Sequence, residues 1–185
     1  GVLTHMGVAH QEGFENQAAK IEEKLQLFSD CNTIIYHSDD EQVDHLMKQQ
    51  YQDRQLLNWS TKDTNAKVYV EFSKQKTVTE IKLKSKEAVV ALTIPFADDA
   101  SIENAITCFV ALQATTLWDA SLIHRFESLP SIAMRLELKK GMHNCSLLSD
   151  IYNADSVSLS NALQVLQQQK QHDVKSIILS DIPDV

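Results

Sequence analysis

The chain has 185 residues, of which 43% are apolar and 23% charged, and its formal net charge is −8. This length suffices for one buried core, or for one domain with part of a second. The acidic balance argues against nucleic acid as a partner, because phosphates attract surplus Lys and Arg. No apolar run approaches the roughly 18 residues that a membrane span needs, so membrane insertion is not expected either. Cys31, Cys108 and Cys145 form neither a disulfide framework nor a zinc motif, and this favours a reducing, cytoplasmic setting.

The first segment with unusual composition is "GVAHQEGF" (7–14), which follows an apolar run predicted to be a strand at residues 2–5. It places His10 and Glu12 between two of the four glycines, Gly7 and Gly13. Glycine permits a sharp bend, so the segment fits an ordinary turn. The sharper alternative is a metal or phosphate site at the end of a strand.

Residues 16–94 alternate between helical and extended patterns. Apolar residues at helical spacing predict a helix over 16–28, and "NTIIYHSDD" predicts a buried strand at 33–36. A second helix should follow, capped by Asp39 or Asp40. Strand and helix in alternation indicate an α/β domain with a parallel sheet. Four alternating runs between residues 54 and 94 predict an antiparallel meander beside it.

The rest of the chain contains further helices and strands. A helix is predicted over 98–118, with Asp99 or Ser101 near its N-cap, and another follows before Pro130. Strands at "MRLELKK" and "CSLLSDIY" flank Gly141, and a helix over 156–171 precedes a terminal strand at "SIILSD". Because core elements stand near both ends, we expect the chain to be an excised piece of a longer protein.

Polar side chains gather where three of the predicted strands end. His10 and Glu12 follow the first strand, residues 37–40 the second, and residues 150–155 the strand "CSLLSDIY". Parallel sheets bind ligands at the carboxyl ends of their strands, so these clusters are candidate site residues. Each also has a plainer interpretation, as a turn histidine or as a helix cap.

Taken in order, several segments resemble motifs of the Mur ligases, the ATP-dependent enzymes that add amino acids to the peptidoglycan precursor. "GVAHQEGF" is similar to their A-H-L-E-x-F segment, "YHSDD" to N-x-D-D, "IENA" to the end of H-N-x-x-N-A, and "MRLELKKG" to G-R-x-E. "SDIYNADSVSLSNAL" resembles the D-D-S-Y-N-A-N-P-x-S-M-x-x-A-L segment of the branch that adds D-alanyl-D-alanine. The resemblance covers nearly the whole chain.

The resemblance implies a truncated central ATPase domain of that family, a P-loop-like parallel sheet with helices and a small meander. It places this domain at residues 1–173 and the first strand of a C-terminal ligase domain at 174–185. It further implies an amide ligase that joins D-alanyl-D-alanine to UDP-N-acetylmuramoyl-tripeptide through an acyl phosphate. The partners would be these two substrates and the missing N-terminal and C-terminal domains of the same chain.

Site residues follow from the resemblance position by position. His10 would bind a second Mg²⁺, and Lys24, carbamylated by carbon dioxide, would supply carboxylate-like oxygens at the metal site and so act in catalysis. Arg135 would face the phosphates of ATP, where guanidinium neutralises charge. The adenosine moiety would be held by the remaining set, Asn104, Asp150, Asn153 and nearby Tyr152.

The motifs depart from the family pattern at several positions. His37 replaces the asparagine of N-x-D-D, Ala100 and Ser101 replace a His-Asn pair, and Asp155 and Ser156 replace Asn-Pro. Such variation resembles the form of this ligase that is fused to an alanine racemase, a parent that would also bind pyridoxal phosphate. The departures affect the expected adenine contacts most.

The printed sequence contains no G-x-x-x-x-G-K-[ST] phosphate loop. We therefore expect the 185-residue chain alone neither to hydrolyse ATP nor to ligate any substrate. Two alternatives to the D-alanyl-D-alanine ligase stay open: a noncatalytic module of the same fold that serves a fused or partner enzyme, and a folate polyglutamate ligase.

Overall fold

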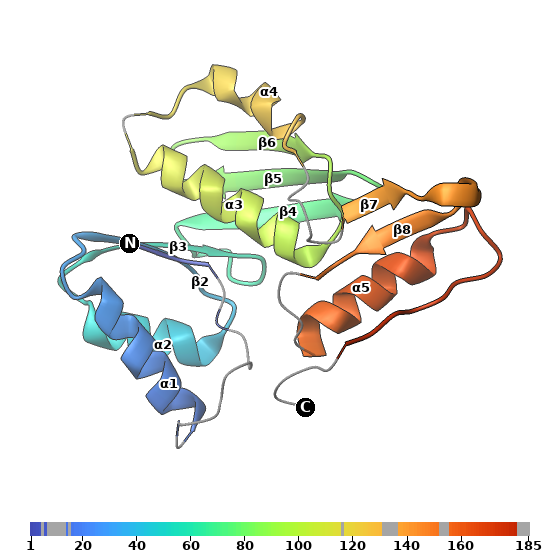
Figure 1. Ribbon diagram of the computed structural model, residues 1–185. Coiled ribbons are helices and arrows are strands. Elements are labelled where there is room, and N and C mark those ends of the chain that lie inside the picture. The colour runs from blue at the N-terminus through green and yellow to red at the C-terminus, as the bar shows by residue number, and fades with distance from the viewer. Residues whose placement is uncertain are drawn as a thin grey trace. The chain divides into compact units, whose positions relative to one another are not determined.

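The computed structural model describes residues 1–4, 6, 14, 16–115, 117–130, 137–151 and 156–180. The chain divides into two compact units, Gly1–Leu129 and Pro130–Val185 (Figure 1). The predicted domain boundary at residues 173 and 174 stays a prediction. The predicted segment around His10 and Glu12 lies outside the described residues, and so do Arg135, Tyr152 and Asn153.

The first unit is built on a six-stranded sheet whose strands lie in chain order. The strands are β1 (Val2–Leu3), β2 (Thr33–His37), β3 (Gln55–Ser60), β4 (Val68–Lys74), β5 (Thr79–Ser85) and β6 (Val89–Ile94). Strands β1 to β4 run parallel, and β4 to β6 are antiparallel. The predicted α/β class with a parallel sheet and a meander is confirmed.

One strand direction was predicted wrongly. The run at 54–60 was expected in the antiparallel meander, but it forms β3, which pairs in parallel with both β2 and β4. Alternating side chains indicate a strand without indicating its direction. The direction comes from the connection, since helix α2 (Glu41–Gln50) carries the chain back across the sheet between β2 and β3, as parallel pairing requires.

Helices cover both faces of the sheet, and β2 shows how. Ile34 and Tyr36 point to the side where α1 (Gln17–Leu25) and α2 pack, whereas Ile35 belongs to the core beneath α3 (Asp99–Gln113). Successive side chains of a strand point to opposite faces, so a strand apolar at every position must be covered twice. Figure 1 shows α1 and α2 together on one side and α3 on the other.

The helix ends follow capping chemistry, with one correction. The side chain of Asp40 accepts hydrogen bonds from the amides of Gln42 and Val43 and so caps α2, as one of the two predicted choices. Helix α3 is capped by Asp98, which accepts from the Ser101 amide at 2.8 Å, and not by Asp99 or Ser101. Both predicted residues already lie inside the helix, Asp99 one position and Ser101 three positions after the cap. Local sequence spacing locates a helix end only to within a few residues.

The helix predicted over 98–118 ends at Gln113, and the next one is shorter than expected. A 3₁₀ turn (Ala120–Leu122) leads into α4 (Ile123–Phe126), beside β6. The ring of Phe109 on α3 meets Trp118 edge to face, with 4.7 Å between the ring centroids, and Phe126 at 6.4 Å. These aromatic contacts close the core at that end of the sheet.

The second unit is a hairpin with a helix. β7 (Glu137–Lys140) and β8 (Ser146–Ser149) pair antiparallel around the 3₁₀ turn Met142–Asn144, and α5 (Ser156–Gln168) follows. The terminal strand predicted from residue 176 is not formed in the described residues up to 180. The side chains of Ile177, Ile178 and Leu179 are exposed there. No helix in the described parts of the chain is both long and apolar enough to cross a membrane.

Candidate functional site

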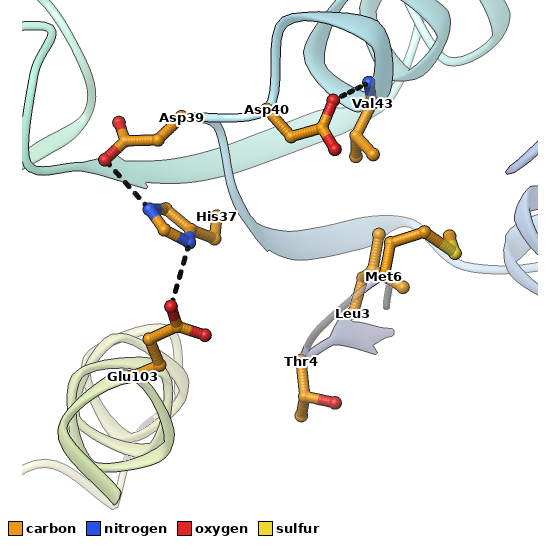
Figure 2. A pocket seen from close by; sticks show the side chains of 8 residues that line it. All are labelled: Leu3, Thr4, Met6, His37, Asp39, Asp40, Val43 and Glu103. Atoms are coloured by element: carbon orange, nitrogen blue, oxygen red, sulfur yellow. Dashed lines mark hydrogen bonds and ion pairs between the residues drawn. The ribbon is translucent and has the colours of Figure 1, made fainter. Parts of the chain in front are cut away.

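A pocket of about 360 Å³ opens in the first unit, where β1 and β2 end. The end of β1, the β2–α2 turn and α3 contribute its walls (Figure 2). The carboxyl ends of parallel strands are where such sheets usually bind ligands. The lining residues are Leu3, Thr4, Met6, His37, Asp39, Asp40, Val43 and Glu103.

His37 is the central side chain of this pocket. Its ring is stacked on Trp59, with 3.8 Å between the centroids and 4° between the planes. Nε2 lies 3.0 Å from Oδ2 of Asp39, and Nδ1 lies 4.0 Å from Oε1 of Glu103. Carboxylates from two different elements therefore face the two ring nitrogens.

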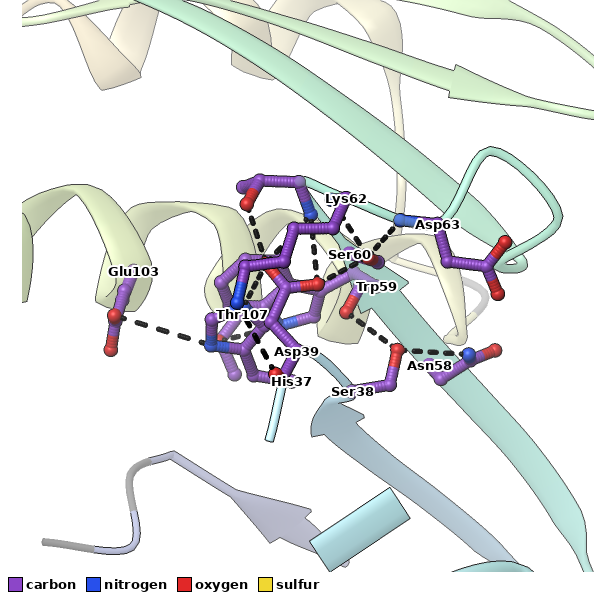
Figure 3. A network of polar contacts seen from close by, with 11 residues as sticks. His37, Ser38, Asp39, Asn58, Trp59, Ser60, Lys62, Asp63, Glu103 and Thr107 are labelled. Atoms are coloured by element: carbon purple, nitrogen blue, oxygen red, sulfur yellow. Dashed lines mark hydrogen bonds and ion pairs between the residues drawn. The ribbon is translucent and has the colours of Figure 1, made fainter. Parts of the chain in front are cut away.

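Trp59, on which the His37 ring is stacked, is itself fixed in position. Its side chain is completely buried, and its indole Nε1 donates a hydrogen bond to Thr107 on α3 at 3.1 Å. Parallel pairing sets His37 opposite Trp59 at the ends of β2 and β3. The position of the imidazole is thus determined by strand register and by α3 together (Figure 3).

Asp39 is held by donors from the end of β3. Its carboxylate accepts hydrogen bonds from the Ser60 hydroxyl and from both the amide and the hydroxyl of Thr61. Burial by itself raises the pKa of Asp39, but the hydrogen bonds from Ser60 and Thr61 outweigh it and hold that pKa well below its usual range. Asp39 is consequently an anion at every physiological pH.

The predicted metal ligand Lys24 lies in the last turn of α1, with an exposed side chain. Four residues earlier, Lys20 is buried, and burial followed by the charge of Lys24 lowers the pKa of Lys20. The predicted partner of Lys24, His10, lies outside the described residues. Within the described part of the chain, no group of three His, Cys, Asp or Glu side chains is arranged to hold a metal ion.

The predicted nucleotide residues are distributed over both units. Asn104 is exposed in the first half of α3, next to Glu103 of the pocket. Because α1 and α3 cover opposite faces of the sheet, Asn104 and Lys24 stand on helices that do not pack together. Asp150 is half-buried directly after β8, in the second unit.

Sequence patterns missed the partners of His37 and Asp39. The sequence predicts a polar cluster or a helix cap at residues 37–40, and it gives no indication of the part played by Trp59, Ser60, Thr61 and Glu103. The available signal was the pairing of two polar strand ends, "YHSDD" and "NWSTKD", which become neighbours once β2 and β3 run parallel.

Comparison with known protein families identifies the family of this chain. Residues 1–112 match the sequence family described as the Mur ligase middle domain. A search of curated protein sequences finds no match.

Comparison with solved structures shows which proteins share the fold of this chain. A UDP-N-acetylmuramoylalanyl-D-glutamyl-2,6-diaminopimelate--D-alanyl-D-alanyl ligase from Acinetobacter baumannii superposes with a TM-score of 0.74 at 18% identity, over 91% of this chain and 37% of that one. MurF ligase from Thermotoga maritima in complex with ADP superposes with a TM-score of 0.69 at 15% identity, over 90% of this chain and 38% of that one. A mutant of FPGS from L. casei superposes with a TM-score of 0.67 at 13% identity, over 90% of this chain and 42% of that one.

The chain spans about two fifths of the length of these structures, and at such identities they establish a shared fold. The family match is independent of them and covers more than half of the chain, including the whole sheet, the pocket and nearly all of α3. The chain therefore belongs to the Mur ligase family, through its middle domain.

Proposed function

We propose that the complete protein is an ATP-dependent amide ligase of peptidoglycan synthesis in the cytoplasm, which joins D-alanyl-D-alanine to UDP-N-acetylmuramoyl-tripeptide. The observation that carries the proposal is the ordered set of family motifs, above all "SDIYNADSVSLSNAL", on a chain of the Mur ligase family. The structural likeness to a ligase named for D-alanyl-D-alanine addition is consistent with it.

The reaction would begin with transfer of the γ-phosphoryl group of ATP to the tripeptide carboxylate. Phosphoryl transfer depends mainly on positioning and charge neutralisation. Arg135 would neutralise phosphate charge, and Asn104, Asp150, Tyr152 and Asn153 would hold the adenosine moiety. The dipeptide amine would then attack the acyl phosphate.

Magnesium fits the donor set under one chemical condition. Mg²⁺ prefers oxygen ligands, and an ammonium group repels it. The exposed side chain of Lys24 is accessible to carbon dioxide, and a carbamate at Lys24 would present two oxygens in place of a positive charge. Lys24 and His10 are therefore proposed metal ligands, with the carbamate as the group that makes the site anionic.

The test is ADP release by the full-length protein. It is measured with UDP-N-acetylmuramoyl-tripeptide, in the presence and absence of D-alanyl-D-alanine. Release that requires both substrates supports the ligase. If circular dichroism shows a folded protein that releases no ADP, the noncatalytic module is favoured. The replaced motif residues at positions 37, 100, 101 and 155 are the sequence evidence for that alternative.

A folate polyglutamate ligase is the second candidate, favoured by the likeness to FPGS from L. casei. The same assay with a folate and glutamate separates it from the first. Turnover with these substrates, and none with the muramoyl tripeptide, would replace the proposal. A racemase fused to the parent would be recognised by bound pyridoxal phosphate, through its visible absorption.

A further inference from the structure

A second pocket, of about 360 Å³, lies within the second unit at the turn of the β7–β8 hairpin. The hairpin forms one wall, and the residues that follow α5 form the other. Figure 1 shows the end of α5 beside the hairpin turn. We call this space the hairpin pocket, and its lining residues are Leu138, Lys139, Lys140, Asn144, Cys145, Ser146, Gln171 and His172.

Hydrogen bonds hold the two walls of the hairpin pocket together. The hydroxyl of Ser146 donates to Oε1 of Gln171 at 2.9 Å, and it lies 3.1 Å from Nε2 of His172. A hydroxyl has one proton, so with that proton directed to Gln171 the imidazole is the donor in the second contact. Ser146 is paired with Lys140 across the antiparallel ladder, and paired residues share one face of the hairpin.

Backbone hydrogen bonds fix the turn at the closed end of the hairpin. His143 and Asn144 have φ angles of 53° and 60°, in the left-handed region that these two residue types enter more readily than most. The amide of Cys145 donates to the carbonyl of Met142 at 3.1 Å, and the amide of Gly141 donates to the carbonyl of Cys145 at 2.8 Å. The wall formed by Asn144 and Cys145 therefore belongs to a closed turn.

The lining carries positive charge. Lys139 and Lys140 contribute ammonium groups, and none of the eight lining residues is Asp or Glu. The ammonium of Lys139 pairs with Glu137, outside the lining, at 2.9 Å. Lys140 forms no ion pair with any residue of the described ranges, so its charge is left uncompensated. An anion would be attracted to this pocket, and a cation would be repelled.

The polar groups match a phosphate better than a carboxylate. Lys140, Asn144 and His172 can each donate a hydrogen bond, and a phosphate monoester offers three acceptor oxygens and up to two charges. A pocket of this volume also has room for an organic group beside the phosphate. Leu138 shares a strand face with Lys140 and is 48% exposed, so such a group would cover apolar surface.

We propose that the hairpin pocket binds a small phosphorylated molecule, with its phosphate group at Lys140 and its organic part against Leu138. This inference goes beyond the proposed function. Every lining residue lies in the second unit, and none is among the residues assigned above to ATP or magnesium. The site can therefore be tested without any assay of ligation.

Cys145 provides a measurement that is specific to this pocket, because its exposed thiol is part of the lining. In the full-length protein, alkylation by iodoacetamide is followed by mass spectrometry of the peptide that contains Cys145, while phenyl phosphate is titrated. We expect phenyl phosphate to slow this alkylation in a saturable manner. Alkylation of Cys108, an exposed thiol on α3, should keep its rate.

Variants test the role of charge. We expect Lys140→Gln to raise the half-protecting concentration of phenyl phosphate about tenfold, because a charge-assisted hydrogen bond is lost. Glu137→Gln should lower that concentration, since it removes the negative partner of Lys139. Lys86→Gln is the matched control, because it removes the same charge from an exposed position of the first unit. Equal effects of Lys140→Gln and Lys86→Gln would contradict the site.

Two further probes test the ligand class. Inorganic phosphate lacks the organic part, and phenylacetate replaces the phosphate by a carboxylate, so both should protect Cys145 only at higher concentrations. Equal protection by inorganic phosphate would exclude the contact with Leu138, and equal protection by phenylacetate would exclude the preference for phosphate. Absence of protection by phenyl phosphate would overturn the proposal. So would a Cys145 that is not alkylated in the unliganded full-length protein, because the pocket would then be covered.

Discussion

The carboxylate of Asp39 links the end of β2 to the end of β3. It accepts hydrogen bonds from Ser60 and Thr61, and it lies beside Nε2 of His37. A buried donor that loses its acceptor costs more than the bond itself contributes, because the donor stays away from water. Asp39 is therefore the side chain of the site on which the local structure depends most.

We expect Asp39→Ala to lower the free energy of unfolding by about 3 kcal/mol at pH 7, measured by urea denaturation. The pKa of Asp39 is lower in the folded state than its unfolded value of about 3.9, so its charge stabilises the fold above that value. This contribution is lost as the pH falls through the pKa of Asp39 in the folded state. The difference in free energy of unfolding between wild type and Asp39→Ala should therefore become smaller in acid.

Asp53→Ala is the control for this variant, since Asp53 is exposed and its neighbour Arg54 is its ion-pair partner. It should change the free energy of unfolding by no more than about 0.5 kcal/mol. Equal effects of the two substitutions, or a gap that does not depend on pH, would contradict the role given to Asp39.

Lys24 carries a separate prediction about chemistry. Lys24→Ala in the full-length protein should abolish ligation, because the proposed carbamate oxygens are lost. Short carboxylic acids added to the assay should restore part of the activity by supplying an oxygen anion at the same place. Full activity of the variant without any addition would remove the carbamate from the mechanism.

At the scale of elements, α3 depends on a cap that lies one residue before its first turn. Asp98 accepts the hydrogen bond of the Ser101 amide, while Asp99 pairs with Lys74 on the exposed end of β4. An N-cap contributes about 1 kcal/mol, whereas an exposed ion pair contributes little.

We expect Asp98→Ala to lower the free energy of unfolding by about 1 kcal/mol and Asp99→Ala by less than about half of that. Urea denaturation followed by circular dichroism measures both. The reverse order would assign the cap to Asp99, as local sequence spacing had suggested. Because α3 carries Glu103 and Asn104, the cap also helps to hold the candidate site in place.

At the scale of the whole molecule, the printed chain lacks a phosphate-loop motif. We expect the purified 185-residue chain to release no phosphate from ATP above a blank, measured with a coupled phosphate assay in the presence of Mg²⁺. The full-length protein, assayed in parallel with both substrates, is the positive control. Phosphate release by the short chain would show that ATP turnover does not need the loop.

Much of the fold was predictable because periodicity is a local property. Apolar residues at helical or alternating spacing identified α1, α2, α3 and the strands of the first unit, and ordered motifs indicated the family. The cap by Asp40 was also predictable from local chemistry, because an N-cap side chain bonds to backbone amides only two or three residues further along the chain.

Tertiary structure alone decided the direction of β3 and the surroundings of His37. Alternation of side chains specifies which residues share a face, and it leaves the partner strand and the register open. Trp59 and Glu103 reach His37 only through strand pairing and through the packing of α3 on the sheet. The sequence by itself thus determined the elements and the family, while the polar network of the pocket arose from contacts between segments distant in the chain.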